Sequence, residues 1–377
     1  MSEDELFFIL RAFASLTPIK YLAWPSTTAI EEIQTFLIDR LISSDYFRLY
    51  PPSANYQKSF WKWIISRIEE QDEEVREEIY SRYLAFLDHS PIEVISVAQV
   101  PPPSYVTYIW RDTPTGSAGE NLELSIEKCR KCTLFEARTI IESGTTGLRT
   151  WTASFVLADY LICHRKGVLK SSRILELGSG IGFLGIILAQ LQIEGINNSP
   201  HINSENRVQP CLCLTDLDEQ VLRRCANNVK LPCNNTMAHP ELRITFLDWM
   251  DALDEFRRNN LVSFFEEMKP DLILGADLVY DVSIIPALVA TLHLALTIGQ
   301  TNSSGRQAII AATRRNEDTL RKFVTEVKKI GLRIEELNSE QNEISSSSRF
   351  LRSQPDAIGE NANCVKMFVI TNKTDME

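Results

Sequence analysis

A strand that ends in glycines decides the fold class of this chain: Ile174-Leu175-Glu176-Leu177-Gly178-Ser179-Gly180-Ile181-Gly182. An apolar helix follows, so the segment predicts a strand, a tight turn and a helix. Glycines in such a turn let the backbone approach a ligand closely, with helix N–H groups pointing at it. Gly180-x-Gly182-x-x-Gly185 also fits the dinucleotide fingerprint, but a lone match is weak evidence. A turn needed only for packing is the structural alternative.

The chain after Gly147 alternates short apolar runs with amphipathic stretches, which is the pattern of βα units around a mainly parallel sheet. We therefore predict an α/β fold with a doubly wound, Rossmann-like sheet of seven strands. The expected strands are Arg173–Leu177, Cys211–Thr215, Arg243–Leu247, Asp271–Gly275, Gln307–Ala312, Leu332–Glu336 and Val365–Thr371. The expected helices lie near residues 152–164, 183–194, 218–231, 283–297 and 317–330.

The first part of the chain has a different periodicity. Apolar residues recur three or four apart in Thr28–Leu41, Phe60–Ile68 and Val75–Leu87, which predicts an N-terminal helical domain over residues 1–90. Residues 91–142 read as a linker with short strands, and residues 143–377 as the sheet domain. Trp63 falls off the apolar stripe, so we expect it to pack against the second domain or a partner. Residues 197–209 and 339–363 are expected to be exposed, mobile insertions.

The acids at the strand ends separate the possible ligands. A dinucleotide site receives a pyrophosphate, whereas an S-adenosylmethionine site accommodates a sulfonium, an amino acid end and an adenosine. Glu176, just before the glycines, suits the ligand that carries an ammonium and a sulfonium. Asp216, at the end of the next strand, can accept ribose hydroxyls from either ligand, and it can also cap the helix that follows.

Two further strand ends carry candidate residues, since ligands bind at the carboxyl ends of strands in such sheets. Trp249 could cover an adenine face or be a core tryptophan. Asp277 and Tyr280 place a carboxylate and a phenol at the mouth of the sheet. A buried acid beneath a pocket suggests function, and a cap for the next helix is the structural alternative for Asp277.

Four motifs in this order resemble one family: Glu-Leu-Gly-Ser-Gly-Ile-Gly, Thr-Asp-Leu-Asp, Leu-Asp-Trp and Ala-Asp-Leu-Val-Tyr-Asp. They are similar to the seven-strand S-adenosylmethionine-dependent methyltransferases of the Asp-x-x-Tyr protein-lysine group. The helical part with Tyr50-Pro51-Pro52-Ser53-x-x-Tyr56, and Thr313-Arg314-Arg315-Asn316-Glu317, resemble the enzymes that methylate a lysine of translation elongation factor 2. The resemblance covers nearly the whole chain apart from the two insertions.

The resemblance implies a cytoplasmic protein-lysine N-methyltransferase with S-adenosyl-L-methionine as cofactor and elongation factor 2 as protein substrate. Asp277 and Tyr280 would then be catalytic, standing by the transferable methyl group and orienting the acceptor amine rather than serving as a general base. The resemblance also implies cofactor-binding residues, which are Trp151, Gly178, Ser179, Gly180, Asp216, Trp249 and Ala276. Glu176 joins them because its position just before the glycines suits a ligand with an ammonium and a sulfonium.

Composition limits the other possibilities. Fifty acidic and 39 basic residues give a net charge of −11, which disfavours a nucleic acid or an anionic membrane surface as partner. No apolar run reaches the roughly 18 residues of a membrane span. The eight cysteines form no regular framework and are expected to be reduced, and Cys129-x-x-Cys132 lacks a second ligand pair, so no metal is expected.

Three other functions stay open. The same sheet could methylate another protein or a small molecule, because the motifs specify the methyl donor better than the acceptor. The chain could also be a non-catalytic relative that binds a partner, although the intact Asp277-x-x-Tyr280 pair argues against this. An NAD-dependent oxidoreductase is the most distant alternative.

Overall fold

The computed structural model describes residues 2–87, 101–111, 125–139, 141–142, 144–168, 171–198, 209–298, 305–337, 350 and 364–372. The chain divides into two compact units, residues 1–142 with 352–359, and residues 143–351 with 360–377. We keep the three-part division at residues 90 and 142 as a proposal. Of the two predicted insertions, all but residues 197, 198, 209 and 350 lie outside the described residues.

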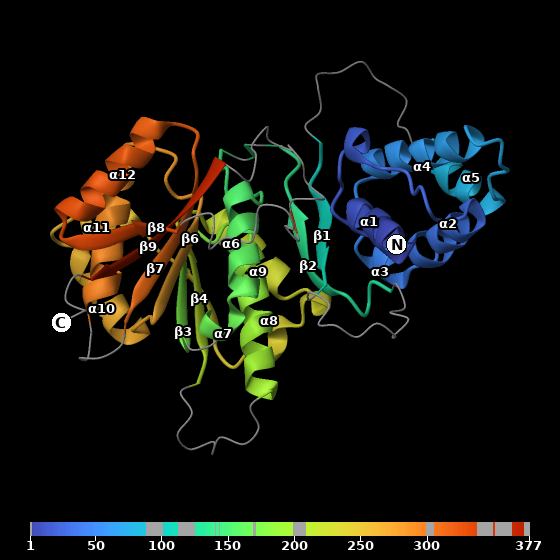
Figure 1. Cartoon of the computed structure of the whole chain (residues 1–377). Helices are drawn as coiled ribbons and strands as arrows, with labels where there is room; N and C mark the ends of the chain where they lie inside the picture. The colour runs from blue at the N-terminus through green and yellow to red at the C-terminus, as the bar shows by residue number, and fades with distance from the viewer. Residues whose placement is uncertain are drawn as a thin grey trace. The chain divides into compact units, whose positions relative to one another are not determined.

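The second unit is built on one sheet, in which seven strands are paired within the described residues (Figure 1). Its order is β5-β4-β3-β6-β7-β9-β8, and every strand pair is parallel except the two that β9 makes with β7 and β8. The strands are β3 (Arg173–Leu177), β4 (Cys211–Asp216), β5 (Leu242–Phe246), β6 (Leu272–Ala276), β7 (Gln307–Thr313), β8 (Leu332–Glu336) and β9 (Val365–Asn372). The predicted fold class and each predicted strand are confirmed.

Helices cover both faces of this sheet. In Figure 1, α6 (Thr152–Cys163), α8 (Phe183–Asn197) and α9 (Glu219–Val229) lie on one face, and α10 (Arg258–Met268), α11 (Ile285–Thr297) and α12 (Glu317–Lys329) lie on the other. Short helical segments complete the unit: α7 (Arg165–Val168), Pro232–Asn234, Thr236–Ala238 and Trp249–Ala252. The sequence did not predict α10, although its buried residues Leu261, Phe265 and Met268 have helical spacing.

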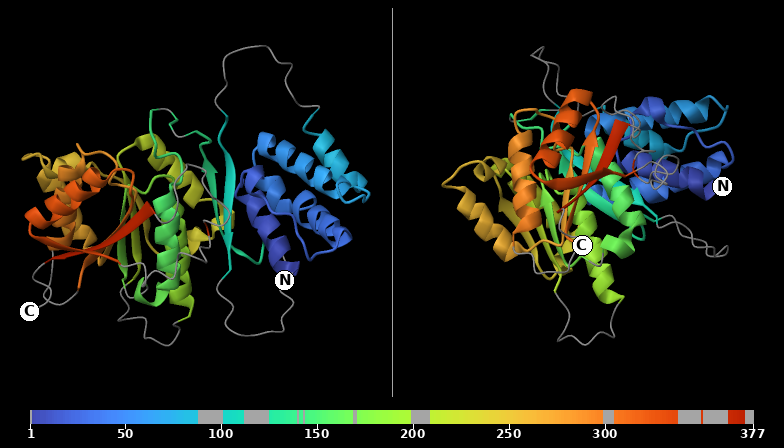
Figure 2. Two further views of the ribbon diagram at one scale, coloured as in Figure 1. Left: turned by 45° about the horizontal axis from the view of Figure 1, so that its top comes forward. Right: turned by 60° about the vertical axis from the view of Figure 1, so that its left-hand side comes forward.

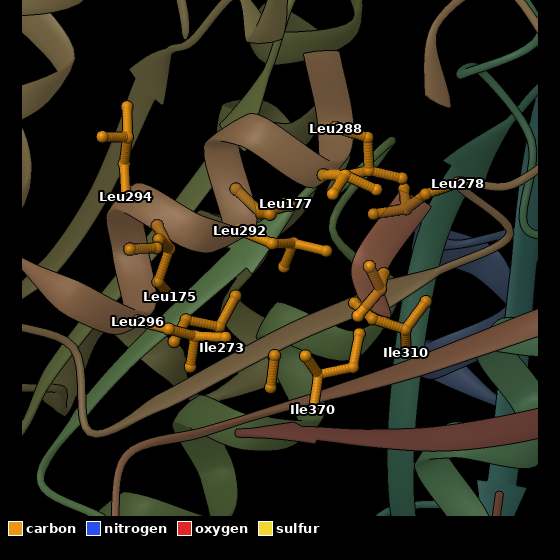
Figure 3. Close-up of a cluster of buried hydrophobic side chains, with 14 of the residues drawn as sticks. Leu175, Leu177, Ile273, Leu278, Leu288, Leu292, Leu294, Leu296, Ile310 and Ile370 are labelled. Atoms are coloured by element: carbon orange, nitrogen blue, oxygen red, sulfur yellow. The ribbon is translucent and has the colours of Figure 1, made fainter. Parts of the chain in front are cut away.

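The core between the sheet and α11 consists almost entirely of aliphatic side chains (Figure 3). Leu175, Ile273 and Ile310 point from three neighbouring strands, and Leu288 and Leu292 meet them from α11; all five are fully buried. Each such side chain contributes about 1.5–3 kcal/mol by leaving water. This layer fixes the strands side by side, and therefore fixes where their carboxyl ends stand.

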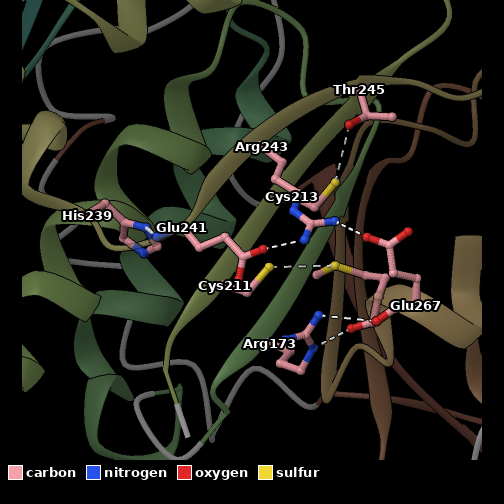
Figure 4. Close-up of polar contacts among 9 residues, drawn as sticks. Arg173, Cys211, Cys213, His239, Glu241, Arg243, Thr245 and Glu267 are labelled. Carbon is pink, nitrogen blue, oxygen red and sulfur yellow. Dashed lines mark hydrogen bonds and ion pairs between the residues drawn. The ribbon is translucent and has the colours of Figure 1, made fainter.

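The amino ends of the strands are joined by a polar network (Figure 4). Arg243 pairs with Glu241 and Glu267, and the Arg173 guanidinium donates to the carbonyl oxygen of Glu267 at 3.3 Å. Cys213 is buried beside them, and burial raises the pKa of its thiol to about 11. Cys213 therefore packs in the core of the sheet domain.

The first unit contains α1 (Ser2–Ala14), α2 (Ile30–Leu37), α3 (Asp45–Leu49), α4 (Ala54–Glu69), α5 (Glu77–Leu84), a three-residue helical turn (Ile19–Tyr21) and a π-helical turn (Ile38–Ile42). An antiparallel pair, β1 (Ser104–Trp110) and β2 (Arg130–Glu136), belongs to the same unit, and α1 packs against β1 (Figure 2). The sequence predicted neither α1 nor α3. Trp63 packs within this unit, with ring centroids 5.7 Å from Trp24 and 6.2 Å from Phe60, and a contact with the second domain or a partner stays a prediction.

No helix among the described residues is both long and apolar enough to span a membrane.

Candidate functional site

A cavity of about 210 Å³ opens at the carboxyl ends of β3, β4, β5 and β6, beside the segment that leads into α6. The four strands are parallel neighbours, so their ends deliver side chains to one place. All ten residues proposed from the sequence line this cavity: Trp151, Glu176, Gly178, Ser179, Gly180, Asp216, Trp249, Ala276, Asp277 and Tyr280.

The turn after β3 requires glycine. Gly178 has φ +60°, and a Cβ there would lie 2.5 Å from the side chain of Leu278. Gly180 has φ +53°, and a Cβ there would lie 3.2 Å from the carbonyl oxygen of Gly147. Both positions disfavour any side chain, so bare backbone forms this wall of the cavity.

Glu176 is a buried acid with an unmet hydrogen bond. Its side chain is 3% exposed, and its Oε2 has no hydrogen-bond partner among the described residues. Burial, together with the nearby charge of Asp216, raises the pKa of Glu176 well above its usual range. An orphaned carboxylate oxygen in a cavity calls for a donor on the ligand, and a ligand ammonium would satisfy it.

Asp216 ends β4 and holds the glycine turn. Its carboxylate accepts hydrogen bonds from the backbone N–H of Gly180 at 3.1 Å and of Asp218 at 3.2 Å, and burial raises its pKa. The cap of α9 is Asp218, which accepts from the N–H groups of Gln220 and Val221. The alternative that Asp216 is the helix cap is therefore wrong.

Two tryptophans border the cavity. Trp249 follows β5, lines the cavity and also packs against the main core, which agrees in part with the core tryptophan of the structural alternative, while its contact with an adenine stays a prediction. Trp151 precedes α6, and its indole N–H donates to the carbonyl oxygen of Thr146 at 3.0 Å. Each ring is partly exposed and fixed from behind, which leaves an aromatic face available to a ligand.

Asp277 has an unusual backbone conformation, and its side chain is paired with an arginine. Its φ is +59°, a left-handed conformation that costs a residue with a side chain about 1–3 kcal/mol. Its backbone N–H donates a hydrogen bond to the carbonyl oxygen of Ala311 on the neighbouring strand β7, which continues the pairing of β6 with β7. The carboxylate is 4% exposed and accepts two hydrogen bonds from the Arg315 guanidinium, at 3.2 and 2.7 Å. The alternative that Asp277 caps the next helix is wrong, because α11 begins after Ile284.

Tyr280 lies at the mouth of the cavity and is 58% exposed. Partial burial raises the pKa of its phenol, and the carboxylates of Asp216, Asp281 and Asp277 act in the same direction. The hydroxyl therefore stays protonated near neutral pH and can donate or accept a hydrogen bond.

With this geometry in place, comparison with known proteins identifies the family. Residues 138–330, half of the chain and nearly all of the cavity, match the lysine methyltransferase family. The chain belongs to that family. Membership confirms the resemblance found in the sequence, the expected cofactor S-adenosylmethionine and the expected enzyme class, an S-adenosylmethionine-dependent protein-lysine N-methyltransferase.

Relatives of this lysine methyltransferase include protein-lysine N-methyltransferases of two names. Protein-lysine N-methyltransferase EFM3 of Chaetomium thermophilum is 34% identical over 207 residues, about half of either chain. Protein-lysine N-methyltransferase EEF2KMT is 24% identical in Bos taurus, over 87% of this chain and 88% of the relative, and 24% identical in Homo sapiens, over 86% and 87%. A solved S-adenosylmethionine-dependent methyltransferase of Agrobacterium tumefaciens is 12% identical, over 69% of this chain and 72% of that one, with a TM-score of 0.38, too distant to support a functional inference.

The cavity of this lysine methyltransferase fits the cofactor of its family. Bound there, S-adenosylmethionine would offer an ammonium to the unpartnered Oε2 of Glu176 and ribose hydroxyls to Asp216. The backbone wall at Gly178 and Gly180 admits a ligand where a side chain would block it, and the indole of Trp249 can cover a flat base.

Arg315 was not predicted from the sequence to contact a site residue, but it forms an ion pair with Asp277. The segment 313–317 was quoted only for its resemblance, yet Arg315 pairs with Asp277 and its guanidinium lies 5.1 Å from the ring centroid of Trp151. A signal was present, because an arginine directly after a predicted strand stands at the same sheet edge as the other strand-end residues. Arg149 and Asp248 also line the cavity and were not proposed.

Proposed function

We propose that this lysine methyltransferase transfers a methyl group from S-adenosylmethionine to a lysine side chain of translation elongation factor 2. One observation carries the choice of acceptor. The match to EEF2KMT of Bos taurus extends over 351 residues and 87% of this chain, more than the methyltransferase unit contains, so it includes much of the helical N-terminal unit. Similarity outside the catalytic unit supports a shared protein substrate, since the described residues that line the cavity all belong to the catalytic unit. A cytoplasmic location follows from this acceptor.

The roles of the site residues form part of the proposal. Glu176, Asp216 and Trp249 would hold the amino acid end, the ribose and the adenine of the cofactor, with Trp151, Gly178, Ser179, Gly180 and Ala276 completing its site. Asp277 and Tyr280 would stand beside the acceptor amine. The helical unit would contribute to recognition of the folded substrate.

The acceptor lysine must be neutral before it reacts. Its ammonium has a pKa of about 10.4 in water and no lone pair, so a proton must leave to solvent first. Entry into a partly apolar cavity lowers that pKa because the charged form loses hydration. The bound cofactor supplies a methyl group on a sulfonium; the amine nitrogen forms the new bond to carbon, and the electron pair of the broken carbon–sulfur bond stays on sulfur.

Asp277 and Tyr280 would orient the amine, and their oxygen atoms would accept hydrogen bonds from its N–H groups, which strengthen as positive charge develops on the nitrogen. Asp277 is unsuited to be a general base, because an arginine and the N–H of Thr313 already stabilise its ionised form. Positioning of the amine in line with the methyl carbon would therefore supply most of the rate.

Labelled S-adenosylmethionine and purified elongation factor 2 test this function directly. We expect transfer of label by the wild-type protein and none by Asp277→Ala. A parallel incubation with a cytosolic extract identifies the acceptor without prior choice. Label on a different protein band, or on small molecules alone, would disprove the proposed acceptor, and a signal that persists in Asp277→Ala would indicate a contaminating enzyme.

A further inference from the structure

The pairing between Asp277 and Arg315 leaves one vacant acceptor position on the carboxylate. An ionised carboxylate has about four lone-pair positions on its two oxygens. Oδ1 accepts from the N–H of Thr313 at 3.3 Å and from Nη1 of Arg315 at 3.2 Å, and Oδ2 accepts from Nη2 of Arg315 at 2.7 Å. The remaining lone pair is therefore on Oδ2, which can take one N–H of an incoming amine.

The charge of the pair matters as much as its geometry. A buried carboxylate without a partner would attract an ammonium and hold it in the protonated, unreactive form. Arg315 cancels that charge through a bidentate contact, so the pair as a whole is neutral. The Oδ2 atom of Asp277 can still accept a hydrogen bond. An amine that meets a neutral pair has no net electrostatic reason to remain protonated.

We propose that Arg315 is a positioning residue for methyl transfer: it fixes the Asp277 carboxylate with one free lone pair on Oδ2 and cancels its charge, so that the acceptor lysine binds as the neutral amine. This inference rests on the proposed function, since it assigns a role toward the same acceptor. Trp151 helps to hold Arg315 in place, because the guanidinium lies over its ring, 5.1 Å from the ring centroid.

Other charged and titratable groups around the cavity remain unchanged when Arg315 is altered. They are Glu176 on β3, Asp216 at the end of β4, Asp248 after β5, Tyr280 and Asp281 after β6, and Arg149 before α6. The neighbouring Arg314 pairs with Glu317 at the surface, where both side chains are exposed. The proposal therefore attributes to Arg315 a pH effect that Arg314 should not have.

The pH dependence of kcat tests the proposal. The rate rises with pH as the bound lysine loses its proton. In Arg315→Gln no positive charge offsets the carboxylate of Asp277, so the protonated form of the bound lysine is favoured. We therefore expect the rise of kcat with pH to shift to higher pH by about one unit. At pH 7 kcat should then fall about tenfold or more, with recovery at high pH. Arg315→Lys keeps the positive charge but loses the bidentate contact with Asp277. The rise of kcat should then begin near the same pH as in the wild type, while kcat itself is lower.

Arg314→Gln is the matched control, and we expect its pH profile and its kcat to equal those of the wild type. A loss of activity in Arg315→Gln with the rise of kcat at the same pH as in the wild type would overturn the proposal and leave only a structural role. So would an Arg315→Gln variant that is as active as Arg314→Gln at pH 7.

A second measurement needs neither cofactor nor acceptor. Urea unfolding midpoints of Arg315→Gln, Asp277→Asn and the double variant form a cycle, and we expect the double variant to lose less than the two single losses combined. Strict additivity would show that the two side chains are not coupled and would overturn the proposal. If the wild type does not label elongation factor 2, the proposed acceptor is wrong, and the unfolding cycle still decides whether the pair exists.

Discussion

The two edges of the same sheet use charge in opposite ways. At the amino edge, Arg243 pairs with Glu241 and Glu267, and its side chain is 41% exposed. At the carboxyl edge, the Asp277 side chain is 4% exposed and sits on a left-handed backbone. Both edges contain arginine–carboxylate contacts, but only one contact is buried and accompanied by backbone strain.

The difference agrees with the proposed division between groups that maintain the fold and groups that take part in methyl transfer. Exposed ion pairs contribute about 0–1 kcal/mol because water and salt screen them. A buried pair pays for desolvation, and removal of one partner strands the other charge. Strained backbone and buried, incompletely satisfied acids collect at the carboxyl edge, which is the edge that lines the cavity.

The largest effect is expected for Asp277→Ala. This change would remove the proposed acceptor for the lysine amine, and we expect kcat to fall by about 10²–10³-fold or more. Binding of S-adenosylhomocysteine, measured by titration calorimetry, should survive. The assigned role is wrong if cofactor affinity is lost while turnover at saturating cofactor remains intact.

A smaller effect on binding is expected for Asp216→Asn. The amide replaces a charged hydrogen-bond acceptor for the ribose, so the Kd of S-adenosylhomocysteine should rise about tenfold, since such bonds are worth about 1.5–3 kcal/mol. Asp218→Asn is the control, because Asp218 caps α9 and does not line the cavity. Equal affinity losses in the two variants would argue against a direct contact by Asp216.

Replacement of the buried acid Glu176 by glutamine is expected to stabilise the protein, and the size of this gain should depend on pH. The pKa of Glu176 is well above its ordinary value of 4.5 in the folded protein, so its contribution to stability is full at low pH and is lost as pH rises through the folded value. Glutamine cannot ionise, so Glu176→Gln without cofactor should be more stable than wild type by about 1–3 kcal/mol near pH 8. Melting curves at pH 4, 6 and 8 should show the gain shrinking toward pH 4; a gain that grows there would contradict this cause.

The smallest effect is expected at the amino edge. Arg243→Gln breaks two exposed ion pairs and should lower the free energy of unfolding by less than about 1 kcal/mol, measured in urea. Methyl transfer should be unchanged because the network lies at the edge opposite to the cavity. A clear loss of kcat in this variant would show that the two edges are coupled.

The strands were predictable because each central strand is buried on both faces and so forms an uninterrupted apolar run, as in Leu272–Ala276. The helix α10 was not predicted, although the spacing of its apolar residues is helical. The reversal of β9 was not predicted, because pairing direction depends on which strands become neighbours and leaves no mark in local periodicity.

The sequence by itself determined the chemistry available at the cavity: glycines that leave backbone bare, and acids and aromatics placed directly after apolar strands. Ordered motifs along one chain were sufficient because the ends of parallel strands meet at one edge. Only the tertiary structure decided which acid is unsatisfied, which acid caps a helix, and which cation neutralises Asp277. Arg315 is 38 residues from Asp277 in sequence, and the two meet because β6 and β7 are adjacent in the sheet. Hydrogen bonding and burial depend on such neighbours, which no local pattern of residues records.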